Sequence, residues 1–260
     1  ALAEKGKAPV KLRVTVSRDR VQWVSSVRAD PDRYEGTRGL GMAEAYAKLK
    51  RDSDSGAARP AEADLLLADF EAYRGDLRAA REAIARGQAR NPKDERFAAA
   101  LSRYALLEGE GAKALAIARE ATARAPASLD AWLALCEAAR IEGLADEAAS
   151  GCQRAIDLAA GDARGWLGLG TVESERDNLR RARVLLGKAV SLAPQDPRAL
   201  SEDGTAAAIA GDPGAARERF TRALELQPDD YVAWTGLGIL EMRLGHLEAA
   251  TEALLKATLI

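Results

Sequence analysis

The sequence predicts an all-α solenoid of antiparallel helical hairpins, and three observations support this prediction. Residue types recur with a period of 34 from Ala61 to Ile260. Within each period, apolar residues follow the i, i+3, i+4, i+7 spacing of amphipathic helices. Glycine and proline recur at fixed places between the helical stretches. A period of this length indicates stacked helical units rather than a globular enzyme fold.

Six repeats are predicted: 61–94, 95–128, 129–162, 163–196, 197–230 and 231–260. We number each repeat from position 1. Position 20 is alanine in all six repeats, and position 8 is small, for example Gly170 and Gly204. We expect position 8 to face the alanines of position 20, so that the two helices approach closely. Position 4 holds Trp132, Trp166 and Trp234, which we interpret as core side chains.

Turns between the predicted helices carry their own signals. Position 15 is glycine in five repeats and Asp177 in the fourth. Glycine can adopt a positive φ there and end the first helix without a Cβ clash. Proline at position 32 ends the second helix, and polar residues that can cap the next helix follow it.

The first sixty residues do not keep the period. Residues 1–37 are predicted to form a strand-like or irregular extension, because Val10, Leu12, Val14 and Val16 alternate with polar residues. A hairpin with residues 21–24 is possible, and a short helix there is the alternative. Residues 38–60 are predicted to be a capping helix, residues 39–51, and a linker. This helix is expected to cover the apolar face of the first repeat.

The repeat pattern resembles the tetratricopeptide repeat family, whose signature is W-x2-L-G-x2-Y followed by Ala, an aromatic residue, Ala and Pro. The sixth repeat carries Trp234, Leu237, Gly238, Ala250 and Ala257 at these offsets. Position 11 departs from the family, because glutamate or alanine replaces the usual tyrosine. The resemblance implies a right-handed superhelix. In addition, residues 10–24 resemble the junction between a FecR-like segment and tetratricopeptide repeats in bacterial cell-envelope proteins.

The family resemblance also implies a concave groove lined by positions 2, 5, 9, 12 and 13 of the first helix of each repeat. Arginine there suits carboxylate recognition, although the same charges could simply solvate the helices. The paired Lys and Asn of the family's carboxylate clamp are absent, so C-terminal chaperone tails are not the expected ligand. The candidate partner-binding residues are Arg96, Arg103, Glu137, Arg140, Arg164, Thr171, Arg198, Ser201, Thr205, Thr235 and Arg243.

Several classes of function find no support in the sequence. The formal net charge of −2 gives no whole-chain attraction to nucleic acid or membrane, and no apolar run approaches the length of a membrane span. His246 is the one histidine and falls in a turn, so neither a metal site nor a catalytic role is expected. No nucleophile motif or phosphate loop is found, and we expect no enzyme activity and no cofactor.

The two cysteines, Cys136 and Cys152, lie in one repeat at positions 8 and 24. We judge them about one helical turn out of register, so a disulfide is not expected, and we interpret both as small buried residues. The compartment stays open. The initial Ala-Leu-Ala fits the remnant of a signal-peptide cleavage, which slightly favours periplasm or cell envelope over cytoplasm, and a fragment boundary explains it equally well.

Two further features break the pattern. Asp203 stands at position 7, which is leucine in the other repeats. We expect it either to cap or pair with a nearby arginine, or to mark a loose, roomy fifth repeat. The last helix has no polar cap after it, which predicts that the chain continues beyond Ile260 or that this end packs on a partner, including another copy.

The function predicted from these observations is a non-catalytic scaffold that binds a peptide or a partner-protein segment in its concave groove. The alternative is a docking domain of a larger enzyme or envelope assembly factor, whose remaining part would lie beyond Ile260.

Overall fold

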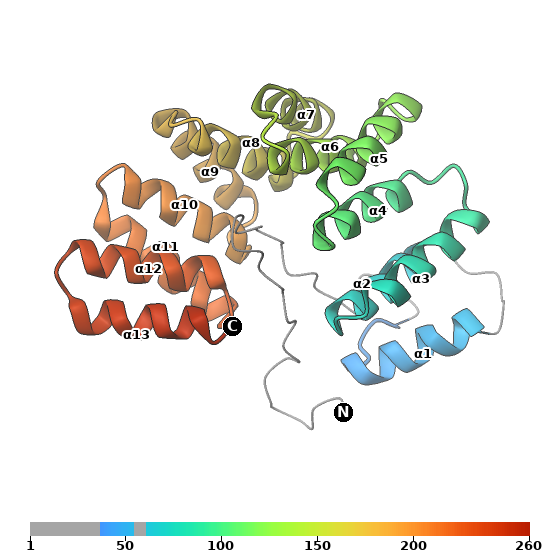
Figure 1. Ribbon diagram of the computed structural model, residues 1–260, viewed down its shortest axis with the longest axis horizontal. Helices are drawn as coiled ribbons and strands as arrows, with labels where there is room; N and C mark the ends of the chain where they lie inside the picture. Colours follow the sequence, from blue (N-terminus) through green and yellow to red (C-terminus); the bar gives the residue numbers. More distant parts are fainter. Residues whose placement is uncertain (1–36, 55–60) are drawn as a thin grey trace. The chain divides into compact units, whose positions relative to one another are not determined.

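A computed structural model describes residues 37–54 and 61–260, which contain helices and no strand (Figure 1). The expected all-α fold of helical hairpins is confirmed for these residues, whereas the strand expected from Val10 to Val16 falls outside them. None of the described helices is long and apolar enough to cross a membrane. In chain order they are α1 (Met42–Asp54), α2 (Ala61–Tyr73), α3 (Leu77–Arg90), α4 (Arg96–Leu107), α5 (Gly111–Arg124), α6 (Leu129–Ile141), α7 (Ala145–Leu158), α8 (Ala163–Glu175), α9 (Leu179–Leu192), α10 (Pro197–Ile209), α11 (Pro213–Leu226), α12 (Tyr231–Arg243) and α13 (Leu247–Thr258).

The chain forms two compact units, Ala1–Ala134 and Leu135–Ile260, with the boundary inside α6. In the first unit α2 packs against α1 and α3, and α4 packs against α3 and α5. Leu49 of α1, Phe70 of α2, Ile84 of α3 and Tyr104 of α4 belong to one buried cluster. The capping helix therefore shares the core of the first repeat.

Helix α1 runs from Met42 to Asp54, three residues later than the predicted 39–51. Gly39 has a φ of 75°, a left-handed conformation that cannot continue into a right-handed helix. This glycine is therefore part of the turn before the helix, and Ser53 and Asp54 lie within the last turn of α1.

The second unit repeats one packing scheme. Helix α8 packs with α9, α10 with α11 and α12 with α13, and the first helix α10 also contacts α8 and α12 directly. Phe220 of α11 is fully buried, together with Leu200 of α10 and Leu240 of α12. First helices of successive repeats therefore lie side by side in this unit.

Position 8 meets position 24 across the hairpins of the third to sixth repeats. A Cβ on Gly170 would lie 2.7 Å from the Leu186 side chain, and a Cβ on Gly238 would lie 2.6 Å from Leu254. The backbone of position 20 also lies close to position 8, since Ser102 Oγ at position 8 donates to the Ala114 carbonyl at position 20, at 2.9 Å. Position 8 thus faces the backbone of position 20, as expected. The side chains nearest to position 8, however, belong to position 24.

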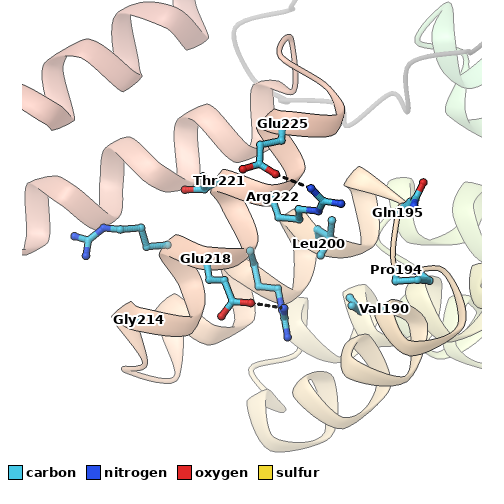
Figure 2. Close-up of a pocket in the computed structure, with 11 residues that line it drawn as sticks. Val190, Pro194, Gln195, Leu200, Gly214, Glu218, Thr221, Arg222 and Glu225 are labelled. Carbon is cyan, nitrogen blue, oxygen red and sulfur yellow. Dashed lines mark hydrogen bonds and ion pairs between the residues drawn. The ribbon is translucent and has the colours of Figure 1, made fainter.

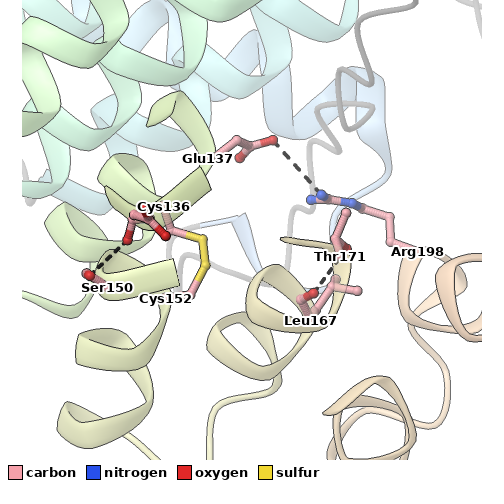
Figure 3. The surroundings of a disulfide bond; sticks show 8 residues. Cys136, Glu137, Ser150, Cys152, Leu167, Thr171 and Arg198 are labelled. Carbon is pink, nitrogen blue, oxygen red and sulfur yellow. Dashed lines mark hydrogen bonds and ion pairs between the residues drawn. A yellow bond between two sulfur atoms is a disulfide. The ribbon is translucent and has the colours of Figure 1, made fainter. Parts of the chain in front are cut away.

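Cys136 and Cys152 form a disulfide between α6 and α7, with their Cα atoms 5.0 Å apart (Figure 3). The expectation of two unpaired buried cysteines is wrong, because positions 8 and 24 face each other rather than lying a turn out of register. Gly168 of α8 packs directly on the bridge, and a Cβ there would lie 2.7 Å from Cys136 Sγ.

Tryptophan at position 4 ties neighbouring repeats together. These side chains are partly buried rather than fully in the core, and each donates its indole N–H to the carbonyl at position 32 of the preceding repeat. The distances are 2.9 Å from Trp132 to Pro126, 2.9 Å from Trp166 to Ala160 and 2.8 Å from Trp234 to Pro228. The recurring tryptophan thus forms a hydrogen bond to the turn that ends the preceding repeat.

Position 11, where the chain departs from the family, carries three buried glutamates that are held by hydrogen bonds. Lys50 Nζ lies 3.1 Å from the first carboxylate, and Asn178 Nδ2 donates to the second at 2.8 Å. Arg217 donates two bonds to the third, at 2.7 and 2.9 Å. The three residues are Glu71, Glu173 and Glu241. A partnered carboxylate therefore replaces the tyrosine at these turns.

Candidate functional site

Positions 2, 5, 9, 12 and 13 of the first helices form what we call the first-helix face. In the first unit it lies on α2 and α4. In the second unit it lies on residues 135–141 of α6 and on α8, α10 and α12.

In the first unit, this face is joined by ion pairs between equal positions of successive repeats. Arg96 reaches Glu62 at 2.6 Å, and Arg103 reaches Asp69 at 2.5 Å. The hydrogen bond from Arg96 lowers the pKa of Glu62 below its usual value. Both predicted arginines of this unit are therefore held by carboxylates one repeat away.

Tyr104 adds to the second of these pairs. Its hydroxyl donates to the Asp69 carboxylate at 2.9 Å, and burial raises the pKa of Tyr104 far above its usual value. Asp69 is itself buried. This buried carboxylate, which accepts hydrogen bonds from Arg103 and Tyr104, therefore has a structural role in the first unit.

Most of the predicted arginines of the second unit also form ion pairs, but these pairs do not join equal positions of successive repeats. Arg140 of α6 binds Glu175 of α8 at 2.7 Å. Arg198 of α10 lies 4.0 Å from Glu137 of α6 (Figure 3). Arg164 binds Asp162, the N-cap residue of its own helix, at 2.8 Å. Arg243, at the end of α12, is exposed and forms no ion pair with the described residues.

Most of the predicted hydroxyl groups bond within the protein. Thr171 and Thr205 donate to the carbonyls four residues earlier in their own helices, both at 3.0 Å. Ser201 is buried and donates to Asp230 at 3.0 Å, where Asp230 also caps α12. Thr235 differs, because its buried Oγ1 has no hydrogen-bond partner among the described residues.

Glu202 of α10 is a charged residue of this region that the groove positions did not include. It is partly buried at position 6, and burial raises the pKa of its carboxyl above the usual value. Arg198 and Arg140 oppose this shift, whereas Glu175 and Asp230 add to it. The signal for it was available, since position 6 is apolar or small in every other repeat: Leu66, Ala100, Ala134, Gly168 and Gly236.

Three large apolar side chains of the first-helix face are open to solvent in the second unit. Ile209 of α10 is 46% exposed, and Ile239 and Met242 of α12 are 45% and 50% exposed. They stand at positions 13, 9 and 12, and α10 and α12 pack against each other. The face therefore has an apolar part on α10 and α12 next to a charged part that reaches from α6 to α10.

A separate cavity of about 780 Å³ lies between the end of α9, the following loop, α10 and α11 (Figure 2). Val190 and Leu200 contribute apolar walls, and arginines of α11 contribute the polar side. Asp203 borders this region and binds Arg219, a lining residue, at 2.9 Å. The first expectation for Asp203, pairing with an arginine, is correct.

No group of three potential metal ligands occurs among the described residues. His246 lies in the turn before α13, where its Nδ1 is 2.7 Å from the Glu241 carboxylate that also binds Arg217. The single histidine thus takes part in one of the position 11 networks.

Comparisons with known proteins agree with the fold. Residues 207–260 match the family model described as tetratricopeptide repeat. A chain of the APC/C hetero-tetramer Cut9-Hcn1 matches with a TM-score of 0.72 and 22% identity, covering 84% of this chain and 43% of that chain. This chain therefore spans less than half the length of that relative. TTC0263, a thermophilic TPR protein of Thermus thermophilus, matches with a TM-score of 0.59 and 24% identity, covering 75% of this chain and 100% of that chain. No curated protein matches the sequence.

Proposed function

We propose that this chain, whose fold is that of tetratricopeptide repeat proteins, is a non-catalytic scaffold that binds a segment of a partner protein on its first-helix face. Proteins of this fold generally mediate protein–protein interactions. The observation that carries the proposal is the exposed apolar part of the face, formed by Ile209, Ile239 and Met242.

Grouping distinguishes these residues from ordinary exposed apolar side chains. Single exposed apolar residues are normal on a soluble protein, and Val184 on the second helix α9, at 73% exposure, is an example. Three such residues lie on the same face of two helices that pack against each other, and apolar patches often mark binding sites. A partner helix or extended segment could cover them in a groove.

The ion pairs change the part that we assign to the arginines. Arg103 and Arg140 already hold carboxylates of neighbouring repeats, so they are not free to recognise a partner's carboxylate without losing those bonds. We propose that they fix the spacing of the first helices, and that Arg243 is the predicted arginine best placed to contact a partner.

A selection of peptides from a displayed random library tests the proposal. Peptides that bind the intact protein are expected to lose at least tenfold in affinity when Ile239→Asp places a charge in the patch. Val184→Asp is the matched control, because it places the same charge on a second helix. Equal losses in the two variants, or none in Ile239→Asp, would contradict the proposal.

The disulfide supports a proposal about compartment, namely that the protein works where thiols are oxidised, as in a periplasm or cell envelope. Protein isolated from its native source and alkylated before reduction is then expected to show no labelled cysteine. Quantitative labelling of Cys136 and Cys152 would place it in a reducing compartment instead.

Self-association is a second candidate function, favoured by α13. Leu255 and Leu259 are 57% and 69% exposed and lie one helical turn apart. Their positions, 25 and 29, are exposed in every other repeat, where small or polar residues occupy them. Light scattering over a concentration series is expected to detect dimers that Leu255→Lys abolishes, whereas a monomer at all concentrations would remove this candidate.

A further inference from the structure

Two consecutive residues, Glu202 and Asp203, replace apolar or small residues of the repeat pattern with carboxylates. Their surroundings differ. Asp203 is buried and bound to Arg219 of α11 at 2.9 Å. Glu202 forms neither a hydrogen bond nor an ion pair with any described residue. One of the two added charges is therefore neutralised within the protein and the other is not.

The arginines near Glu202 are already shared with other carboxylates. Arg140 holds Glu175 at 2.7 Å, and Arg198 lies 4.0 Å from Glu137. With Glu202, which borders this part of the first-helix face from position 6, three glutamates stand against two arginines. The buried Asp230, the N-cap of α12, adds another carboxylate on the remaining side. The local balance is acidic, although the whole face contains many arginines.

The Glu202 carboxylate is partly buried and has no hydrogen-bond partner among the described residues, and its oxygens are not fully enclosed, so a group from a partner can reach them. Burial disfavours the charged form of this carboxyl. A cation from a partner would stabilise that charged form, because a charge-assisted hydrogen bond is stronger than a neutral one. The apolar patch begins close by. Ile209 is seven residues from Glu202 on α10, about 10 Å along the helix axis, which corresponds to about three residues of an extended peptide.

Resting on the function proposed above, we propose that the first-helix face of the second unit selects a partner segment in which a basic side chain accompanies apolar side chains. The ammonium or guanidinium group binds Glu202, and the apolar side chains cover Ile209, Ile239 and Met242. This selectivity is opposite to the carboxylate recognition that the groove arginines first indicate.

Three synthetic peptides test the proposal. They share apolar residues taken from a peptide that binds the intact protein, and they carry Lys, Gln or Glu at one position about three residues away. The Lys peptide is expected to bind about tenfold more tightly than the Gln peptide, as for a hydrogen bond to a charged group. Glu202→Gln is expected to abolish this difference by weakening the Lys peptide more than the Gln peptide.

Lowering the pH provides a second readout. Because burial raises the pKa of Glu202, its carboxylate takes up a proton at a higher pH than an exposed glutamate. The preference for Lys over Gln is therefore expected to shrink as the pH falls below neutral. Arg198, Arg140, Glu175 and Asp230 face the same carboxyl, so the wild-type profile is compared with that of Glu202→Gln, which should be flat.

Two variants separate the possible failures. Glu248→Gln removes an exposed carboxylate of α13 and should leave the Lys preference intact. If the Glu peptide binds as tightly as the Lys peptide, or if Glu202→Gln keeps the preference, the basic partner is wrong. In that case Ile239→Asp still weakens all three peptides when the face is the binding site. If Ile239→Asp weakens none of them, the proposed function itself fails.

Discussion

Asp177 adopts a backbone conformation that the five other repeats give to glycine. Its φ is 63°, whereas the glycines at position 15 have φ values from 75° to 84°. A residue with a Cβ is strained in this region, although aspartate tolerates it better than most. The backbone of the fourth repeat is thus strained at position 15, whereas the repeats that have glycine there avoid this strain.

Replacing this residue is expected to stabilise the protein. Asp177→Gly should raise the free energy of unfolding by about 0.5–1 kcal/mol, because it removes the left-handed strain. Gly143→Asp makes the reverse change in the preceding repeat and should lower it by a similar amount. Urea unfolding of both variants checks this. A loss of stability in Asp177→Gly would mean that the aspartate side chain has a role of its own.

Glu241 makes the stability of the last repeat depend on pH. The hydrogen bonds from Arg217, more than any other cause, hold the pKa of this carboxyl below its usual value, while burial opposes them. A lowered carboxyl pKa contributes stability that is present above about pH 4.3, the unfolded value. This contribution is lost as the pH falls through the folded value.

The expected consequence is measurable by comparison with Glu241→Gln. At neutral pH the variant should be less stable by on the order of 1 kcal/mol, and this difference should shrink as the pH falls through the lowered folded pKa of Glu241. Urea unfolding at a series of pH values gives the result. A difference that stays constant down to the lowest pH would assign the effect to packing and not to charge.

At the scale of the helical hairpin, packing depends on the pairing of positions 8 and 24. Gly204 makes room for Phe220, and Gly238 makes room for Leu254. In the third repeat, the same proximity allows Cys136 to bond covalently with Cys152. The bridge therefore uses a contact that the fourth, fifth and sixth hairpins also have, and it links α6 to α7.

Reduction of this bridge is expected to destabilise the second unit. A disulfide that closes a loop with a sequence separation of 16 residues stabilises by about 3 kcal/mol in the chain-entropy model. Thermal unfolding with and without reductant should differ accordingly. The Cys152→Ala variant is the control and should not respond to reductant. Identical curves for the oxidised and reduced wild type would contradict a structural role.

For the whole molecule, the sequence period predicted more of the fold than of the site. Helical spacing and the turn glycines predict helices where the structure has α2 to α13, because these signals are local. The start of α1 was misplaced because the left-handed φ of Gly39 cannot be read from composition. The disulfide was missed because the facing of positions 8 and 24 depends on how the helices cross.

The candidate residues could be placed on the first-helix face from the sequence, but the residues they pair with could not be predicted. The residues of the ion pair between Glu62 and Arg96 are one full period apart, so only the stacking of repeats brings them together. Glu202 was overlooked because position 6 is not a groove position of the family. The other five repeats nevertheless have an apolar or small residue at position 6, so Glu202 departs from the pattern. Departures from the period therefore carry as much information about the site as the positions that a family supplies.

The central claim is that the first-helix face of α10 and α12 contacts a partner protein. Site-specific photo-crosslinking tests it most directly, with a photoreactive phenylalanine derivative placed at Ile239 or, as a control, at Val184 of α9. In extract from the native source, position 239 is expected to give a defined adduct that excess binding peptide suppresses. Adducts from position 184 alone, or an adduct at 239 that the peptide leaves unchanged, would contradict the claim.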